Sequence, residues 1–283
     1  MTYRTVRNYI EVLKPRASIL LTFIGVCTAI IAGDGQLSLK LLLITLTILL
    51  ASAGANVLTN YLDCNIDSRM QRTRNRALPS KRIDPPEKIL PLNITLVVIG
   101  LGLAWYLHPL CFIADVAGTT ASVVWRKRST CVFPQGMIAS CAPVLMGWFA
   151  IQPVFSWELV LLCVLISAWV PLHVWSVMVA HRQDYVDAGL NFFPVNRQVS
   201  QAIKIFMLFT VMLCAAAIGL YFMADFTLIY ITVAGVLSGL MVYANIRLVI
   251  SNTSKNAWLM YKLSSFPYLG LIFLAMCLNI WLH

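Results

Sequence analysis

Charged side chains are scarce in this chain of 283 residues. They make up 11% of the sequence, and only 11 residues are acidic. A soluble domain carries roughly 25% charged residues, whereas 60% of this chain is hydrophobic and its mean hydropathy is +0.81. These values exclude a soluble globule, a disordered chain, collagen and a coiled coil. A transmembrane barrel would alternate polar and apolar residues, so we expect an all-α polytopic membrane protein.

Paired cysteines are also missing. The eight cysteines are scattered and form no CxxC motif, so neither a zinc site nor a disulfide framework is supported, and we interpret them as small apolar residues within helices. The net charge of +10 is best explained by basic cytoplasmic loops of a membrane protein, and we expect no nucleic-acid partner.

Long apolar runs fill the space between the few charges. Each of nine segments is close to the roughly 20 residues that cross a bilayer as a helix, although the first and fourth are slightly short. We therefore predict a single integral-membrane domain, residues 1–283, with nine transmembrane helices near residues 17–32, 39–61, 89–107, 109–125, 131–151, 157–179, 201–224, 226–249 and 263–282.

The basic residues predict the orientation. If nine segments cross the membrane, 20 of the 21 lysines and arginines fall at the N-terminus or at even-numbered junctions, and only Lys40 lies on the other side. Because cytoplasmic loops are enriched in basic residues, we expect a multi-pass protein of the cell membrane with its N-terminus in the cytoplasm and its C-terminus outside. The 20 residues are Arg4, Arg7, Lys14, Arg16, Arg69, Arg72, Arg74, Arg76, Lys81, Arg82, Lys88, Arg126, Lys127, Arg128, Arg182, Arg197, Lys204, Arg247, Lys255 and Lys262.

The junction after the second segment holds a cluster of oxygen-bearing side chains. On a helix, Asn56, Asn60, Asp63 and Asp67 fall within about 60° of one another. Carboxylates at i and i+4 repel each other unless a cation lies between them, and Mg²⁺ accepts one or two carboxylates together with substrate phosphate. This stripe is either a magnesium site or a helix end that turns polar as it leaves the lipid.

Basic residues follow this stripe directly, with Arg69, Arg72, Arg74 and Arg76 in a run of eight residues. Guanidinium groups can hold a diphosphate through forked hydrogen bonds. Ordinary cytoplasmic positive charge explains the same pattern, and the spacing alone does not separate the two interpretations.

The junction after the sixth segment holds a second acidic pair. If that segment continues as a helix, Asp184 and Asp187 share a face at i, i+3, with His173 about 16 Å deeper on the same face. An ionisable residue at that depth is a candidate functional group, but a histidine bonded to a neighbouring helix is an equal alternative. Pro171 would free a backbone carbonyl nearby. Two acidic clusters backed by arginines on one side of the membrane suggest a two-Mg²⁺ diphosphate site for a lipid-soluble prenyl donor.

At these residues the chain resembles the UbiA superfamily of intramembrane prenyltransferases, and within it the branch that farnesylates protohaem IX. The resemblance covers nearly the whole chain, from Leu13-Lys14-Pro15-Arg16 through the second acidic junction. It is carried by Asn60-Tyr61-Leu62-Asp63, Ile66-Asp67 and Arg72-Thr73-Arg74-Asn75-Arg76, by Trp169 and His173-Val174-Trp175, and by Arg182-Gln183-Asp184-Tyr185, Ala188-Gly189 and Pro194-Val195.

The resemblance implies a function and roles for these residues. It implies transfer of farnesyl from farnesyl diphosphate to a vinyl group of haem B, giving haem O for a haem-modifying enzyme or terminal oxidase downstream. It implies that Asp63, Asp67, Asp184 and Asp187 hold Mg²⁺ with support from Asn60. Diphosphate would contact Lys14, Arg16, Arg72, Arg76 and Arg182, and His173 would orient the haem or contact its iron.

Departures from the family pattern leave alternatives open. Thr59 stands where the family usually has Asn, Cys64-Asn65 replaces an Arg-Asp pair, and Leu172 replaces a proline. These bear on the acceptor, so a prenyltransferase acting on a quinone precursor is the alternative. Asp115 inside the fourth segment favours a transporter, because intramembrane carboxylates often mark ion paths, but no inverted repeat is visible.

Overall fold

The computed structural model describes residues 3–124, 134–196 and 199–282, with side chains from residue 201 in the last range. This part of the chain is helical and contains no strand. Its elements are α1 (Tyr3–Val12), α2 (Pro15–Ala32), α3 (Lys40–Asp67), η1 (Pro86–Ile89), α4 (Leu90–Leu107), α5 (Pro109–Val123), α6 (Gln135–Ile151), α7 (Trp157–Ala180), α8 (Arg182–Asp187), α9 (Val199–Met223), α10 (Leu228–Ile250), α11 (Ser254–Ser264) and α12 (Phe266–Leu282).

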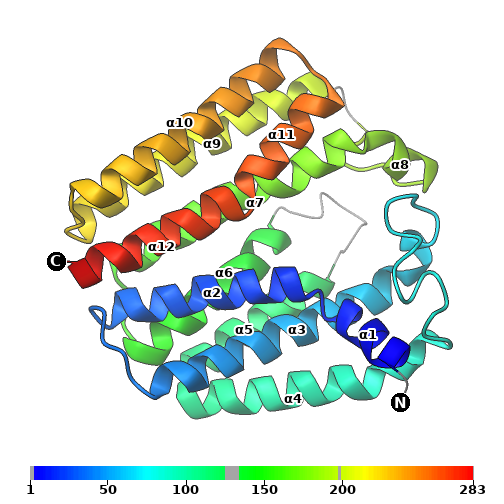
Figure 1. The fold of residues 1–283 in the computed structure, drawn as a ribbon, viewed down its shortest axis with the longest axis horizontal. Helices are drawn as coiled ribbons and strands as arrows, with labels where there is room; N and C mark the ends of the chain where they lie inside the picture. Colours follow the sequence, from blue (N-terminus) through cyan, green and yellow to red (C-terminus); the bar gives the residue numbers. More distant parts are fainter. Residues whose placement is uncertain (1–2, 125–133, 197–198, 283) are drawn as a thin grey trace.

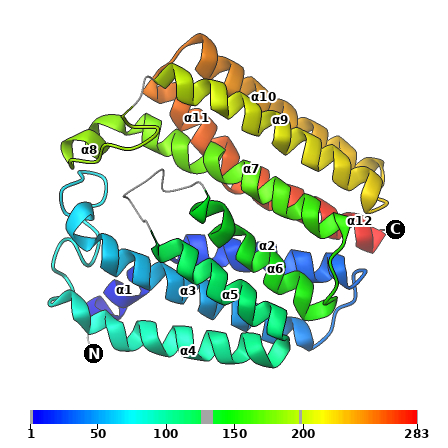
Figure 2. The same cartoon turned by 180° about the vertical axis from the view of Figure 1, so that it is seen from behind.

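The helices form two groups that lie side by side (Figures 1 and 2). One group contains α2 to α6, with α5 on α6, α3 on α4 and α2 on α6. The other contains α7 and α9 to α12, with α9 and α11 against α7 and α10 against α9. Contacts of α6 with α7 and of α2 with α12 join the groups. The first acidic stripe belongs to the first group and the second acidic pair follows α7 in the second.

Seven helical stretches in the described part are long and apolar enough to cross a membrane, so the chain is an integral membrane protein. Two further apolar helices, α5 and α6, are shorter. Each of the nine apolar segments of the sequence contains a helix, but the lengths support seven crossings and leave nine as a prediction. Trp125 and residues 131–133, expected within the fourth and fifth segments, lie outside the described residues.

The last segment differs from the expectation of one helix over 263–282. The helical stretch begins at Ser254 and is broken at Ser265, whose ψ of −141° is not helical. Pro267 in the first turn of α12 lacks a backbone N–H and restricts the residue before it, which explains a fresh helix start here. Because of this break α11 is a separate helix, and its aromatic side chains contact α7.

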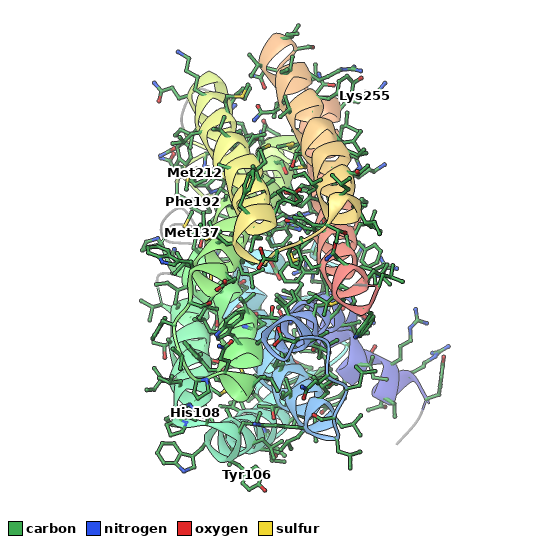
Figure 3. The ribbon with its side chains drawn as sticks, turned by 90° about the vertical axis from the view of Figure 1, so that its left-hand side faces the viewer. Tyr106, His108, Met137, Phe192, Met212 and Lys255 are labelled. Atoms are coloured by element: carbon green, nitrogen blue, oxygen red, sulfur yellow. The ribbon has the colours of Figure 1, made fainter. Side chains whose placement is uncertain are left out.

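Aromatic side chains gather at one end of the bundle. Trp105 and Tyr106 at the end of α4, Phe155 and Trp157 before and at the start of α7, and Trp281 at the end of α12 are all exposed. Figure 3 looks onto this end and shows Tyr106 projecting outward. Exposed aromatic rings at helix ends are typical of a membrane–water interface.

Close backbone contact joins α2 to α6. A Cβ atom at Gly147 would lie 2.0 Å from the Gly25 carbonyl oxygen, and a Cβ at Gly25 would lie 2.7 Å from the Pro143 carbonyl oxygen. Small residues allow helices to approach in lipid, where van der Waals packing replaces the hydrophobic effect as the main attraction. These two glycines therefore fix the distance between α2 and α6.

The opposite end of the bundle carries α1, the segment 68–85 and α8, while the C-terminus lies at the aromatic end (Figure 1). The segment 68–85 is packed against the bundle, because Ala77, Leu78 and Ile83 are buried against Val12 and Val57. The described basic junctions thus meet at one end, as the sequence predicts. The predicted basic residues Arg126, Lys127, Arg128 and Arg197 lie outside the described residues.

Candidate functional site

The polar stripe at the C-terminal end of α3 is buried. The exposed fractions of Asp63 and Asp67 are 4% and 2%, and Asn60 is also buried. The Asn60 side chain donates to the Val12 carbonyl oxygen at 2.7 Å, and Asn56 donates to the Ser18 hydroxyl at 3.0 Å. The two amides therefore tie α3 to the end of α1 and to the first turn of α2. Buried carboxylates on one helix face are the group that the sequence predicts.

The segment after α3 folds back over Asp67. The Arg76 guanidinium lies 2.9 Å from the Asp67 carboxylate, and the Thr73 hydroxyl donates to the Asp67 carbonyl oxygen at 2.9 Å. Asp67 is nearly inaccessible, whereas the Arg76 side chain is 38% exposed. The Arg76 guanidinium therefore contacts Asp67 while part of its side chain stays accessible to solvent.

The continuous helix considered for residues beyond Ala180 is not observed. His181, with φ −113° and ψ 30°, separates α7 from the six-residue helix α8. The break redirects the chain, so Asp184 and Asp187 cannot be placed by extrapolating the helical register of His173. Helix α8 still lies at the same end of the bundle as the C-terminal end of α3 (Figure 1).

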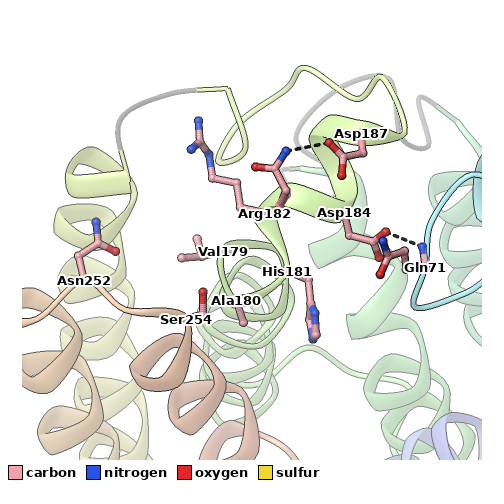
Figure 4. Close-up of a pocket in the computed structure, with 10 residues that line it drawn as sticks. Gln71, Val179, Ala180, His181, Arg182, Asp184, Asp187, Asn252 and Ser254 are labelled. Atoms are coloured by element: carbon pink, nitrogen blue, oxygen red, sulfur yellow. Dashed lines mark hydrogen bonds between the residues drawn. The ribbon is translucent and has the colours of Figure 1, made fainter.

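Asp184 joins the second acidic motif to the first basic segment. Its carboxylate oxygens accept hydrogen bonds from the backbone N–H groups of Gln71 at 2.5 Å and Arg72 at 3.1 Å, more than 110 residues away in sequence (Figure 4). The Arg72 guanidinium also donates to the Tyr185 hydroxyl at 3.3 Å. The two predicted motifs therefore meet in the structure, through a carboxylate and a pair of backbone amides.

A pocket of about 510 Å³ opens beside this junction. Its lining includes His181, Arg182, Asp184 and Asp187 (Figure 4). The Arg182 guanidinium donates through Nε to the Val195 carbonyl oxygen at 2.8 Å, and Asp187 accepts from the Gln183 amide at 2.7 Å. A guanidinium has five N–H donors, so Arg182 keeps donors for an anion.

His181 is the lining residue that the sequence patterns missed. Burial, and then the neighbouring Arg72 guanidinium, lower the pKa of the His181 imidazole below its usual value, while Asp184 opposes them. This pKa direction favours a neutral imidazole in the pocket. No spacing rule in the sequence distinguished His181 from an ordinary helix-end histidine.

A second pocket, of about 590 Å³, lies between the N-terminal elements and the segment 68–85. Its lining includes Lys14, Arg16, Asn60 and Arg76. Lys14 adopts a left-handed backbone conformation, φ 49°, directly before α2, and its ammonium group donates to the Thr59 hydroxyl at 3.4 Å. Four predicted residues from three parts of the sequence therefore line one basic pocket.

A further ion pair holds this pocket together. The Arg82 guanidinium lies 2.7 Å from the Glu11 carboxylate, which also accepts from the Ala77 backbone N–H at 3.0 Å. Neither Glu11 nor Arg82 belonged to a predicted constellation. Glu11 is the one acidic residue of α1. A single carboxylate in this otherwise basic and uncharged stretch is the sequence signal that could have marked Glu11 as an ion-pair partner.

His173 lies within a column of aromatic rings from α7 and α11. Its ring stacks between Trp169, with centroids 4.7 Å apart, and Tyr261, with centroids 4.6 Å apart. Trp258 stacks on Tyr261 at 4.7 Å, and His181 meets Trp258 edge-on at 5.3 Å. The column therefore connects the surface pocket at His181 to the buried interior at Trp169.

Ser264 fixes the deep end of this column. Its hydroxyl lies 3.2 Å from Nδ1 of His173, and its carbonyl oxygen accepts a hydrogen bond from the Trp169 indole. Both faces of the His173 ring and one ring nitrogen are thus occupied. Within the described residues, Nε2 is the nitrogen of His173 that has no protein partner.

The α3 stripe has oxygen donors of the kind that Mg²⁺ binds. It offers two carboxylates at i and i+4 near an amide, and Mg²⁺ uses one or two carboxylates completed by substrate phosphate and water. The Asp67 carboxylate is already paired with Arg76, and no group of three or more histidine, cysteine, aspartate or glutamate side chains with metal-binding geometry occurs within the described ranges. The predicted role of Asp63 and Asp67 in holding Mg²⁺ thus depends on a bound phosphate group.

Comparisons with known proteins identify relatives over almost the whole chain. Residues 18–266 match the model of the UbiA prenyltransferase family. The chain is 33% identical to a protein named protoheme IX farnesyltransferase from Desulforudis audaxviator, over 99% of this chain and 90% of the relative. It is 29% identical to a protein of the same name from Korarchaeum cryptofilum, over 94% of this chain and 91% of the relative.

Solved structures share the fold at lower identity. A structure described in a study of digeranylgeranylglyceryl phosphate synthase superposes with a TM-score of 0.76 at 17% identity, covering 97% of this chain and 98% of that chain. A UbiA homologue from Archaeoglobus fulgidus bound to GPP and Mg²⁺ superposes with a TM-score of 0.66 at 15% identity, covering 96% of this chain and 99% of that chain. These likenesses establish the bundle architecture.

Proposed function

Because the chain belongs to the UbiA prenyltransferase family, we propose that it transfers a farnesyl group from farnesyl diphosphate to a vinyl group of haem B, giving haem O. The curated relatives named protoheme IX farnesyltransferase support this acceptor. The structural observation that carries the proposal is the contact between Asp184 and the backbone of Gln71 and Arg72. That contact unites the two polar motifs that a diphosphate substrate would bridge.

The basic side chains would bind the diphosphate. Lys14, Arg16 and Arg76 line one pocket and Arg182 lines the other. Arg72 contacts Asp184, which lines the pocket of Arg182, and Tyr185. As the bond between C1 and the diphosphate oxygen breaks, negative charge grows on the leaving group. Cationic donors already in place stabilise that charge more than they stabilise the substrate, which lowers the barrier.

The acidic side chains would hold Mg²⁺. Asp63 and Asp67, supported by Asn60, form the group on α3, and Asp184 and Asp187 form the group on α8. A bound Mg²⁺ would supply Lewis-acid stabilisation of the leaving diphosphate. The A. fulgidus homologue binds GPP together with Mg²⁺, which supports the same metal requirement here.

The haem acceptor would lie beside the aromatic column. A porphyrin is broad and flat, and the column offers an aromatic wall that runs inward from His181. His173 would orient the haem or contact its iron through Nε2, the nitrogen left by its bond to Ser264. A quinone precursor as acceptor would need no such nitrogen.

We further propose nine membrane crossings in the cell membrane, with α5 and α6 as the two short spans. The N-terminus and the acidic motifs would face the cytoplasm and the C-terminus would face outside, in keeping with the excess of basic residues at the motif end. Haem O would then pass to a haem-modifying enzyme or a terminal oxidase.

The decisive experiment supplies membranes containing the protein with haem B and isotopically labelled farnesyl diphosphate, followed by mass spectrometry of the extracted haems. We expect a labelled haem heavier by one farnesyl group and one hydroxyl group, together with released diphosphate. Release of diphosphate with label in an added quinone precursor would assign the other acceptor. No diphosphate release would remove the transferase function and leave the transporter hypothesis.

A further inference from the structure

A small polar cavity of about 170 Å³ lies among α2, α3, α5 and α6, next to the first acidic motif. Its polar lining consists of Lys14, Ser52, Asn56, Thr59, Asp115, Thr119, Ser122 and Ser140. Polar side chains within membrane-spanning segments are costly, and they commonly mark a substrate or ion path. None of the residues from α5 has a role in the function proposed above.

Asp115 is the acidic group of this cavity. Its exposed fraction is 5%, and one carboxylate oxygen accepts a hydrogen bond from the Thr119 hydroxyl at 3.2 Å. The ion pairs of the described part of the chain lie elsewhere, at Arg76 with Asp67 and at Arg82 with Glu11. A carboxylate offers about four acceptor positions, so Thr119 leaves most of them available to the cavity.

The cavity shares one lining residue, Lys14, with the basic pocket of the site. Asp115, Thr119 and Ser122 lie at i, i+4 and i+7, on one face of α5 that runs toward the motif end of the bundle. Across from them, Thr59 lies one helical turn before Asp63 and accepts from the Lys14 ammonium group. Lys14 also lines the basic pocket that holds Arg16 and Arg76.

The size and the polarity of the cavity fit water. On this measure one water needs about 10–15 Å³, so a polar space of about 170 Å³ accommodates several waters. The function proposed above consumes water, because a vinyl group that gains a farnesyl group becomes a cation and must then gain a hydroxyl group. The polar lining and the stoichiometry of the reaction therefore indicate the same small molecule.

We propose that this cavity holds the water that the reaction consumes, and that Asp115 removes its proton. Resting on the proposed function, the step begins after C1 of the farnesyl group has bonded to the terminal vinyl carbon. The resulting cation lies on the vinyl carbon attached to the porphyrin ring. A water oxygen bonds to that carbon with its own electron pair, and the Asp115 carboxylate takes the released proton. Without this capture, the cation loses a proton from the adjacent carbon and forms an alkene.

Asp115→Asn tests the proposal through the ratio of two products. The alkene is lighter than the hydroxylated haem by one water, so mass spectrometry of extracted haems measures both. A positioned base typically contributes about 100-fold or more, and we expect the alkene-to-alcohol ratio to rise by about that factor in Asp115→Asn. Thr119→Val keeps the carboxylate and removes its hydroxyl donor, so it should shift the ratio in the same direction by less. In heavy-oxygen water the remaining alcohol should carry the label.

The matched control is Asn245→Ala. Asn245 is a buried membrane-embedded side chain of α10, bonded to the Thr210 hydroxyl and remote from the cavity lining. Its removal tests general damage to the bundle and should leave the product ratio at the wild-type value. If the wild type forms haem O and the ratio is unchanged in both Asp115→Asn and Thr119→Val, the proposal is overturned. A wild type that farnesylates no haem would instead overturn the proposed function itself.

Discussion

The Asp184 carboxylate accepts a hydrogen bond from the backbone N–H of Arg72 at 3.1 Å, although the two residues belong to different halves of the helical bundle. The Gln71 N–H completes the contact at the other carboxylate oxygen. Hydrogen bonds to a charged acceptor are worth about 1.5–3 kcal/mol each when shielded, and less beside an open pocket. The contact therefore contributes to holding the basic segment in place, beside the burial of Ala77, Leu78 and Ile83.

Replacing Asp184 should separate loss of charge from loss of this contact. Asp184→Ala removes both, so we expect kcat to fall by more than 100-fold and proteolysis within segment 68–85 to accelerate. Asp184→Asn keeps one oxygen acceptor and should show slower proteolysis than Asp184→Ala, with activity still low. Asp225→Asn, at the opposite end of the bundle, serves as the control. Wild-type turnover in Asp184→Ala would exclude this carboxylate from the reaction.

Arg76 should matter for stability as well as for binding. Removing the partner of a buried carboxylate commonly costs about 3–5 kcal/mol, and the partial exposure of Arg76 places the expected loss at the lower end. Arg76→Ala should therefore lower the unfolding temperature in detergent, and Arg76→Lys should restore part of it. The lysine variant should still bind farnesyl diphosphate weakly, because an ammonium cannot form the bidentate contacts of a guanidinium. Equal stability of the alanine variant and the wild type would contradict the pairing.

His173 provides the test of the haem acceptor. His173→Ala should lose or shift the Soret band of bound haem B while farnesyl diphosphate binding persists, because the metal and diphosphate residues lie elsewhere. Ser264→Ala is the companion variant: it removes the hydroxyl 3.2 Å from Nδ1 and should alter the Soret position without abolishing haem binding. A His173→Ala protein with the wild-type haem spectrum and normal product would make this histidine purely structural.

Gly147 should tolerate no larger side chain. A Cβ there would approach a Gly25 carbonyl oxygen to 2.0 Å, so α2 and α6 would have to separate. Overpacking in well-packed interiors typically costs about 1–3 kcal/mol, and Gly147→Leu should sharply reduce the yield of folded protein. Gly239→Ala is the matched control, since a Cβ at that position meets no atom within 4 Å. Normal folding of Gly147→Leu would show that the helices separate readily.

Reporter fusions test the orientation. Fusions after Ile66 and after Arg182 should report the cytoplasm, and a fusion after Gly33 should report the opposite side, because of the distribution of basic residues. Opposite locations for the first two fusions would make a shared diphosphate site impossible.

Much of the architecture could be predicted from the sequence because lipid imposes simple rules. Length, apolar composition and the positions of lysine and arginine predicted an all-helical membrane protein whose acidic stripe of Asp63 and Asp67 ends α3. The helix break at Ser265 and the break at His181 escaped prediction, because each is set by the backbone dihedral angles of a single residue, which composition does not reveal.

The contacts of the site depended on long-range packing. Asp184 and Arg72 were both selected from their motifs. No periodicity shows that the backbone N–H of Arg72, rather than its side chain, donates to the Asp184 carboxylate. The aromatic column likewise joins α7 to α11 across about 90 residues, and only the fold brings Tyr261 onto His173.

The two groups of helices also divide the chemistry between two pieces of chain. Residues up to Ile151 carry the α3 carboxylates and Asp115, whereas residues from Trp157 carry Asp184 and the aromatic column. A gene cut between these positions would yield two membrane fragments, neither of which has a complete set of groups. Activity on co-expression would then require correct assembly of the fragments within the bilayer, so the reaction itself would serve as a complementation reporter for helix association in lipid.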